Sequence, residues 1–119
     1  MPVPSVLVKN ELDPKSAIHI IQVACKFIDD DGNNDNQSKN TDVPPGGQDI
    51  LYGTYDHCCR SYIGLMQVRF PNGDTQVIAN TKSVDQGYCG GQLTWHLIPA
   101  AAIAKDWPSH LEPVQFVID

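Results

Sequence analysis

Two alternating runs of apolar and polar residues flank Asn72-Gly73, and they restrict the fold more than any other feature. Met66, Val68 and Phe70 alternate with Gln67 and Arg69 in Ile63–Phe70, and Thr75, Val77 and Ala79 alternate in the return run Thr75–Asn80. Successive side chains of a strand point to opposite faces, and Asn-Gly readily adopts the positive φ angles of a tight hairpin turn. The sequence therefore predicts an antiparallel hairpin with its turn at residues 71–74.

Further strands are predicted from short runs rich in β-branched and aromatic residues, at 17–28, 50–55, 92–98 and 113–118. In the first run, the odd positions from Ile21 to Phe27 form one apolar face. The alternation changes face near Gly64, which predicts a bulge or a strand break there. These strands favour a mainly β fold, an antiparallel β-sandwich or a small barrel, with a two-layer α+β fold as the alternative.

The remaining segments complete a single domain spanning residues 1–119. Residues 1–14, with two prolines among the first twelve residues, are predicted to form an N-terminal arm. Residues 29–48 are polar except for Val43 and are predicted to form a long surface loop. Pro99 followed by alanines predicts a short helix near 99–106.

Four cysteines are present, and Cys58 and Cys59 are adjacent in the sequence. Adjacent strand residues point to opposite faces, and a disulfide between them is strained. Two pairings therefore remain for a framework of two disulfides: Cys25–Cys58 with Cys59–Cys89, or Cys25–Cys59 with Cys58–Cys89. Paired zinc ligands are usually separated by two residues, so this spacing disfavours a zinc site.

The charge of the chain limits its partners. The formal net charge is -6, which opposes binding to nucleic acid, and no apolar run is long enough for a transmembrane segment. The even number of cysteines and the glycosylation sequon Asn36-Gln37-Ser38 favour an extracellular or secreted protein, expressed as a mature form, with a cytoplasmic protein as the alternative. No cofactor is predicted, and the sequence does not indicate an oligomeric state.

Two groups of residues are candidates for a catalytic or a metal site. Cys89 lies in a glycine-rich stretch and could act as a thiol nucleophile with His57 as its base, which would make the protein a cysteine-dependent enzyme. Asp29, Asp31 and Asp35 could supply oxygen ligands to calcium, although their spacing does not fit an EF-hand loop. The prediction is therefore a protein that is not an enzyme and holds no metal.

The favoured function is a lectin-like binding module, a defence protein or a secreted effector that recognises carbohydrate or a cell-surface receptor. Aromatic rings stack on sugars, and polar side chains hydrogen-bond their hydroxyls. The predicted ligand-binding residues are Tyr55, His57, Tyr88, Gln92 and Trp107.

Two alternative functions remain open. One is a membrane-active toxin, a class that this chain matches only in its size and its predicted fold. The other is suggested by Gln76-Val-Ile-Ala-Asn80, which resembles the hairpin of cystatin-type protease inhibitors, with Asn80 where that family has glycine. That resemblance implies protease inhibition.

Overall fold

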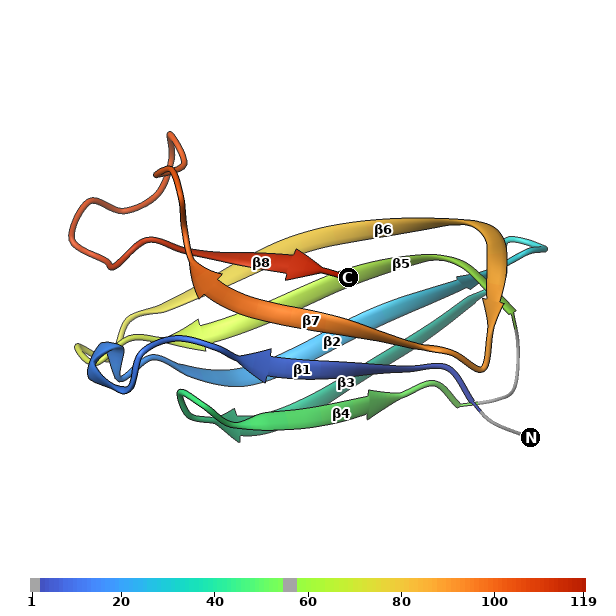
Figure 1. The fold of residues 1–119 in the computed structure, drawn as a ribbon, viewed down its shortest axis with the longest axis horizontal. Helices are drawn as coiled ribbons and strands as arrows, with labels where there is room; N and C mark the ends of the chain where they lie inside the picture. The colour runs from blue at the N-terminus through green and yellow to red at the C-terminus, as the bar shows by residue number, and fades with distance from the viewer. Residues whose placement is uncertain (1–2, 55–57) are drawn as a thin grey trace.

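Two four-stranded sheets pack face to face as a β-sandwich (Figure 1). The computed structural model describes residues 3–54 and 58–119, and of residues 86–88 it describes only the backbone. One sheet has the strand order β4-β1-β7-β8 and the other has the order β3-β2-β5-β6. All neighbouring strands are antiparallel except β1 and β7, which are parallel. The strands are β1 (Ser5–Asn10), β2 (His19–Asp29), β3 (Asn34–Val43), β4 (Gln48–Tyr52), β5 (Cys58–Arg69), β6 (Thr75–Cys89), β7 (Gln92–Pro99) and β8 (Val114–Ile118).

The predicted sandwich is thus confirmed, and so is the hairpin between β5 and β6. The backbone N–H of Phe70 donates to the carbonyl oxygen of Asp74 at 2.8 Å, and Gly73 has a φ of 91°. Gly64, however, lies inside β5 opposite Cys25 and Asn80, and the irregularity of β5 falls between Cys59 and Ser61. The predicted break at Gly64 is therefore wrong.

The core lies between the sheets and follows the alternation of the strands. On β7, the inward-facing side chains are Leu93, Trp95 and Leu97, and the Trp95 ring is completely buried. On β2, a bulge between Ile20 and Gln22 shifts the alternation, so that Ile20 is buried in place of Ile21. The predicted apolar face of β2 is correct from Val23 onward and wrong before the bulge.

The predicted N-terminal arm contains one of the inner strands. β1 pairs with β4 on one side and β7 on the other, and Val6 and Val8 are completely buried. The prolines of this segment lie outside the strand, at residues 2, 4 and 14, so they do not interrupt its ladder of hydrogen bonds. An arm over residues 1–14 is therefore a wrong prediction for residues 5–10.

The polar segment 29–48 also contains a strand, β3, where a long loop was expected. β3 is the edge strand beside β2, so one of its sides and its outer face are open to solvent. It buries only Asp35 and Val43. On the side of the sandwich where β3 and β4 run, the Nζ of Lys39 and the hydroxyl of Thr41 donate to the Asp49 carboxylate at 2.8 Å and 2.7 Å. An edge strand can be this polar because pairing and cross-sheet hydrogen bonds stabilise it with little apolar burial.

The helix expected near 99–106 does not form. The described helical residues are limited to the 3-10 turn η1 (Pro14–Ser16), and residues 100–113 are a loop between β7 and β8. In this loop, Trp107 donates its backbone N–H to Ala104 and its indole N–H to the carbonyl oxygen of Leu111. An isolated helix of eight residues is marginal in water, so the local propensity of the alanines was insufficient.

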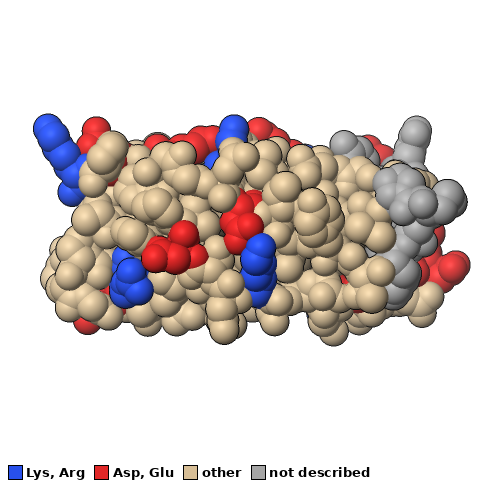
Figure 2. Space-filling model, turned by 90° about the horizontal axis from the view of Figure 1, so that it is seen from below, with Lys and Arg blue, Asp and Glu red and all other residues tan. Residues whose placement is uncertain are grey.

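Charged side chains are sparse on the side of the molecule nearest β3 and β4. Figure 2 shows that acidic and basic residues lie there in small groups, with uncharged residues over most of the surface. Among the described residues, no helix has the length and apolar character needed to cross a membrane.

Candidate functional site

One disulfide joins the beginning of β5 to the end of β6. Cys58 and Cys89 are directly opposite in the ladder, with a Cα–Cα distance of 3.8 Å. This bond belongs to the second of the two predicted pairings, and its presence rules out the Cys25–Cys58 and Cys59–Cys89 bonds of the first.

Cys25 and Cys59 are buried thiols, so the prediction of a second bridge is wrong. Cys25 lies opposite Gly64, whereas Cys59 lies opposite Asp29. Four residues along a strand correspond to about 13 Å, which is well beyond the reach of a disulfide.

The predicted cysteine nucleophile is excluded by the same disulfide, because the Cys89 sulfur is bonded to Cys58. Burial raises the pKa of Cys25 and of Cys59, and for Cys59 it outweighs a hydrogen bond from Tyr62. Both thiols therefore stay protonated near neutral pH and are poor nucleophiles. The proposed base, His57, lies outside the described residues.

Two of the three carboxylates considered for calcium accept hydrogen bonds in separate places. Asp29 accepts hydrogen bonds from the backbone N–H groups of Asp31 and Asn33 within the turn between β2 and β3. Asp35 is buried and accepts hydrogen bonds from Gln37 and from the backbone N–H of Thr54. Within the described part of the chain, no group of three or more metal-ligating side chains comes together.

The predicted ligand-binding residues do not form one site. Gln92 begins β7 and donates to the Ser5 hydroxyl at 3.1 Å, whereas Trp107 lies beyond the other end of β7. Eight strand residues span about 25 Å, so these two side chains are at opposite ends of the sandwich. Tyr55 and His57 lie outside the described residues, and so does the side chain of Tyr88.

The segment that resembles a cystatin hairpin lies in the interior of a strand. Gln76–Asn80 belongs to β6, and the turn of the hairpin precedes it at residues 71–74. Inhibition of proteases stays a prediction, but these five residues are not a hairpin loop.

A hollow at the loop end of the sandwich, beside Trp107, brings together polar side chains from three distant segments. We call it the end hollow; it has a volume of about 250 Å³. The segment before β2, the β5–β6 turn and the β7–β8 loop meet here, at the left of Figure 1. Its lining consists of Ser16, Ile18, Phe70, Pro71, Asn72, His110, Leu111 and Glu112.

The buried aromatic core supports the floor of the end hollow. Phe70 is almost completely buried, and its ring meets the Trp107 ring edge-on with centroids 6.1 Å apart. Leu111 and Ile18 are also buried. The floor is therefore apolar and fixed in place, which suits the C–H face of a ligand.

The rim of the end hollow is polar and carries negative charge. The Nε2 of His110 lies 2.9 Å from the Asp74 carboxylate, which ties the β7–β8 loop to the hairpin turn. Hydrogen bonds from His110 and Asn72 lower the pKa of the Asp74 carboxyl, so this group is ionised at neutral pH. Glu112 lines the hollow and Asp74 lies just outside it, bonded to His110 and Asn72, so the hollow favours neutral hydrogen-bonding ligands over anionic ones.

Most of this site has no signature in the sequence. Its residues come from positions 16–18, 70–72 and 110–112, which share no motif or spacing. Of the predicted ligand-binding side chains that the structure describes, Trp107 lies next to the hollow, against Phe70, and Gln92 does not. No protein-family model matches the chain, and no curated protein or solved structure does so either.

Proposed function

We propose that this protein is a non-enzymatic, lectin-like binding module that holds a neutral carbohydrate in the end hollow. The observation that carries the proposal is the meeting of an amide, an imidazole, a carboxylate and a hydroxyl, from three segments, around an apolar floor. Sugar recognition needs directional hydrogen bonds to hydroxyls together with an apolar surface for the ring. A disulfide-bonded chain of this kind fits an extracellular setting.

A glycan array that includes neutral and sialylated glycans tests the proposal directly. We expect neutral glycans to bind and sialylated ones to bind weakly, because Glu112 and Asp74 repel anions. Titration with a neutral hit should shift tryptophan emission, since Trp107 contacts the floor of the hollow whereas Trp95 is completely buried. An array without hits would refute the proposed function.

Substitution of Glu112 locates the site. Glu112→Ala should weaken binding of the neutral hit by about tenfold, because a hydrogen bond to a charged group is lost. Asp106→Ala is the matched control: it removes a carboxylate from the same loop but outside the lining of the hollow. Isothermal titration calorimetry measures both affinities. Equal affinity for the wild type and Glu112→Ala would place the sugar elsewhere.

A further inference from the structure

The outer face of the β3-β2-β5-β6 sheet carries three regular rows of side chains near its centre. Val23, Cys25 and Phe27 point into the core, so the residues between them on β2 point outward. The ladder places each outward residue of β2 beside one from β3 and one from β5, and β6 completes the row. We call this surface the outer patch; its rows are Asn36-Lys26-Ile63-Thr81, Ser38-Ala24-Leu65-Ala79 and Asn40-Gln22-Gln67-Val77.

The outer patch is unusual in its composition. Charged residues make up 18% of the chain, yet Lys26 is the only charged residue among these side chains. Leu65 and Val77 are large apolar side chains that are 42% and 61% exposed. Amide and hydroxyl groups lie around them on β3, β2 and β6. Depletion of charge, exposed apolar side chains and a polar rim are the features of a protein–protein interface.

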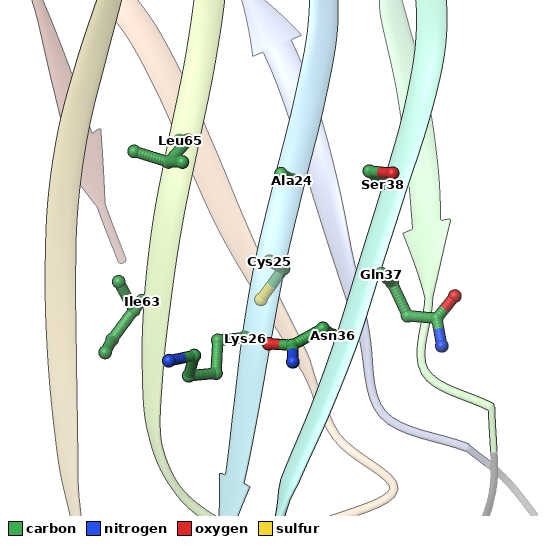
Figure 3. Close-up of a pocket in the computed structure, with 8 residues that line it drawn as sticks. All are labelled: Ala24, Cys25, Lys26, Asn36, Gln37, Ser38, Ile63 and Leu65. Atoms are coloured by element: carbon green, nitrogen blue, oxygen red, sulfur yellow. The ribbon is translucent and has the colours of Figure 1, made fainter.

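The patch has a raised side and a hollowed side. A hollow of about 340 Å³ lies over β2 and β3, where Ala24 and Ser38 have short side chains. Figure 3 shows Ala24 between Ser38 on β3 and the longer Leu65 on β5. A second, smaller hollow extends from Ala24 and Leu65 toward Gln67 and Val77. The Leu65 side chain on β5 therefore projects next to the depression over Ala24 on β2.

We propose that this face binds a second copy of the same chain. In a face-to-face dimer whose twofold axis lies parallel to the strands, β5 of one copy lies over β2 of the other. Leu65 then enters the partner's hollow over Ala24, and Ile63 lies over the aliphatic stem of Lys26. Gln67 lies over Gln22, where the two amides can exchange hydrogen bonds. The patch is thus complementary to itself, as a twofold interface requires.

The size and charge of the face agree with this partner. Four strands and five rows, counting one row beyond each side of the patch, cover roughly 20 Å by 33 Å, or about 660 Å² per copy. About 1,300 Å² in total lies near the lower end of specific interfaces. The chain carries a net charge of -6, so two copies repel each other over most orientations. The three rows of the outer patch contribute no carboxylate to that repulsion, and the one carboxylate in the row beyond Gln22, Asp42, interacts with His19 and Arg69.

Sedimentation velocity tests the proposal on bacterially expressed protein, in which Asn36 on the rim of the patch carries no glycan. Between roughly 1 and 100 µM the wild type should shift from the 13.1-kDa monomer to twice that mass. Leu65→Asp should remain monomeric throughout. Ile103→Asp is the matched control: it places the same charge at an apolar residue, 68% exposed, in the β7–β8 loop, and it should dimerise like the wild type. A wild type that stays monomeric, or a folded Leu65→Asp variant that dimerises, would overturn the proposal.

Disulfide trapping tests the predicted geometry and leaves one of the two Leu65–Ala24 pairs native in the mixed dimer. Ala24→Cys and Leu65→Cys variants, mixed and oxidised, should give a covalent dimer that contains one chain of each. Either variant alone should give little covalent dimer. The two copies of residue 24 lie on opposite sides of the twofold axis, and so do the two copies of residue 65. A mixture that yields no more cross-linked dimer than the separate variants would show that β5 does not lie over β2. The proposal is independent of carbohydrate binding, since the end hollow shares no residue with the outer patch.

Discussion

Gly64 shows how one absent side chain positions the core. A Cβ at this position would lie 2.7 Å from Trp95 Cζ2 and 2.9 Å from Phe116 Cζ. The Trp95 and Phe116 rings themselves pack with centroids 4.9 Å apart, so neither can retreat easily. Gly64 therefore leaves room for Trp95, the largest side chain of the core. The packing of this ring offsets the extra backbone entropy that a glycine loses on folding.

Replacing Gly64 should accordingly destabilise the fold. We expect Gly64→Ala to lower the free energy of unfolding by about 3 kcal/mol, because the added methyl group overpacks a buried site. Urea denaturation followed by tryptophan fluorescence measures the change. Gln67→Ala, on the outer face of the same strand, should change stability by less than about 0.5 kcal/mol. A Gly64→Ala variant as stable as the wild type would contradict the close approach of the Trp95 ring.

At the scale of elements, His96 connects β7 with the segments that follow β1 and β8. Its Nδ1 lies 2.6 Å from the Glu11 carboxylate and its Nε2 lies 2.8 Å from the Asp119 carboxylate. Partial burial lowers the pKa of His96, but the hydrogen bonds with Glu11 and Asp119 outweigh burial and raise it. Protonation of His96 therefore stabilises the folded state relative to the unfolded state.

The pH dependence of this contribution has a defined sign. Because the pKa is raised in the folded state, the stabilisation is fully present below the unfolded pKa of about 6.5 and is lost as pH rises through the folded value. His96→Gln should cost about 1 kcal/mol near pH 5.5 and little near pH 9. Urea unfolding at both pH values measures this loss of unfolding free energy. Gln115→Ala, a neutral change on β8, should change the free energy of unfolding by the same amount at both pH values. A cost for His96→Gln that is equal or larger near pH 9 would contradict the assignment.

The elements also differ in how far the sequence predicted them. β2, β5 and β7 bury alternate residues and β6 half-buries them between Gln76 and Asn80, so apolar side chains recur with a period of two. β3 has the same conformation but almost no apolar residue, because its outer edge and outer face meet solvent. β3 pairs with β2 through hydrogen bonds between backbone groups. The sequence of β3 therefore shows no alternation of apolar side chains that would indicate a strand.

For the whole molecule, the disulfide acts mainly through the unfolded chain. Cys58 and Cys89 are separated by 31 residues, so the bond closes a long loop. Closing a loop of this length lowers the entropy of the unfolded state and stabilises the fold by roughly 3 to 4 kcal/mol. The bond also holds the ends of β5 and β6 together where they leave the hairpin ladder.

Removal of the disulfide gives a measurable result. The double variant Cys58→Ser with Cys89→Ser should lose about 3 kcal/mol of unfolding free energy in urea. Intact mass should rise by about 2 Da when the denatured wild type is reduced, and not at all for the double variant. Cys25→Ala is the control: it should keep the 2-Da shift. A rise of about 4 Da for the wild type would reveal a second bridge and contradict the buried thiols.

The sequence by itself determined the β class of the fold, the hairpin at residues 71–74 and most of the strands, because these follow from local periodicity and turn chemistry. The tertiary structure decided the inner position of β1, the pairing of β3, the single disulfide and the end hollow. Each of these depends on which distant segments lie side by side. Cys25 and Cys59 illustrate the reason: both sit on strands of one sheet, but the register of β2 against β5 places them too far apart to bond. No turn joins β2 to β5, so their register is set by the burial of their apolar faces against the other sheet, which is a property of the tertiary structure.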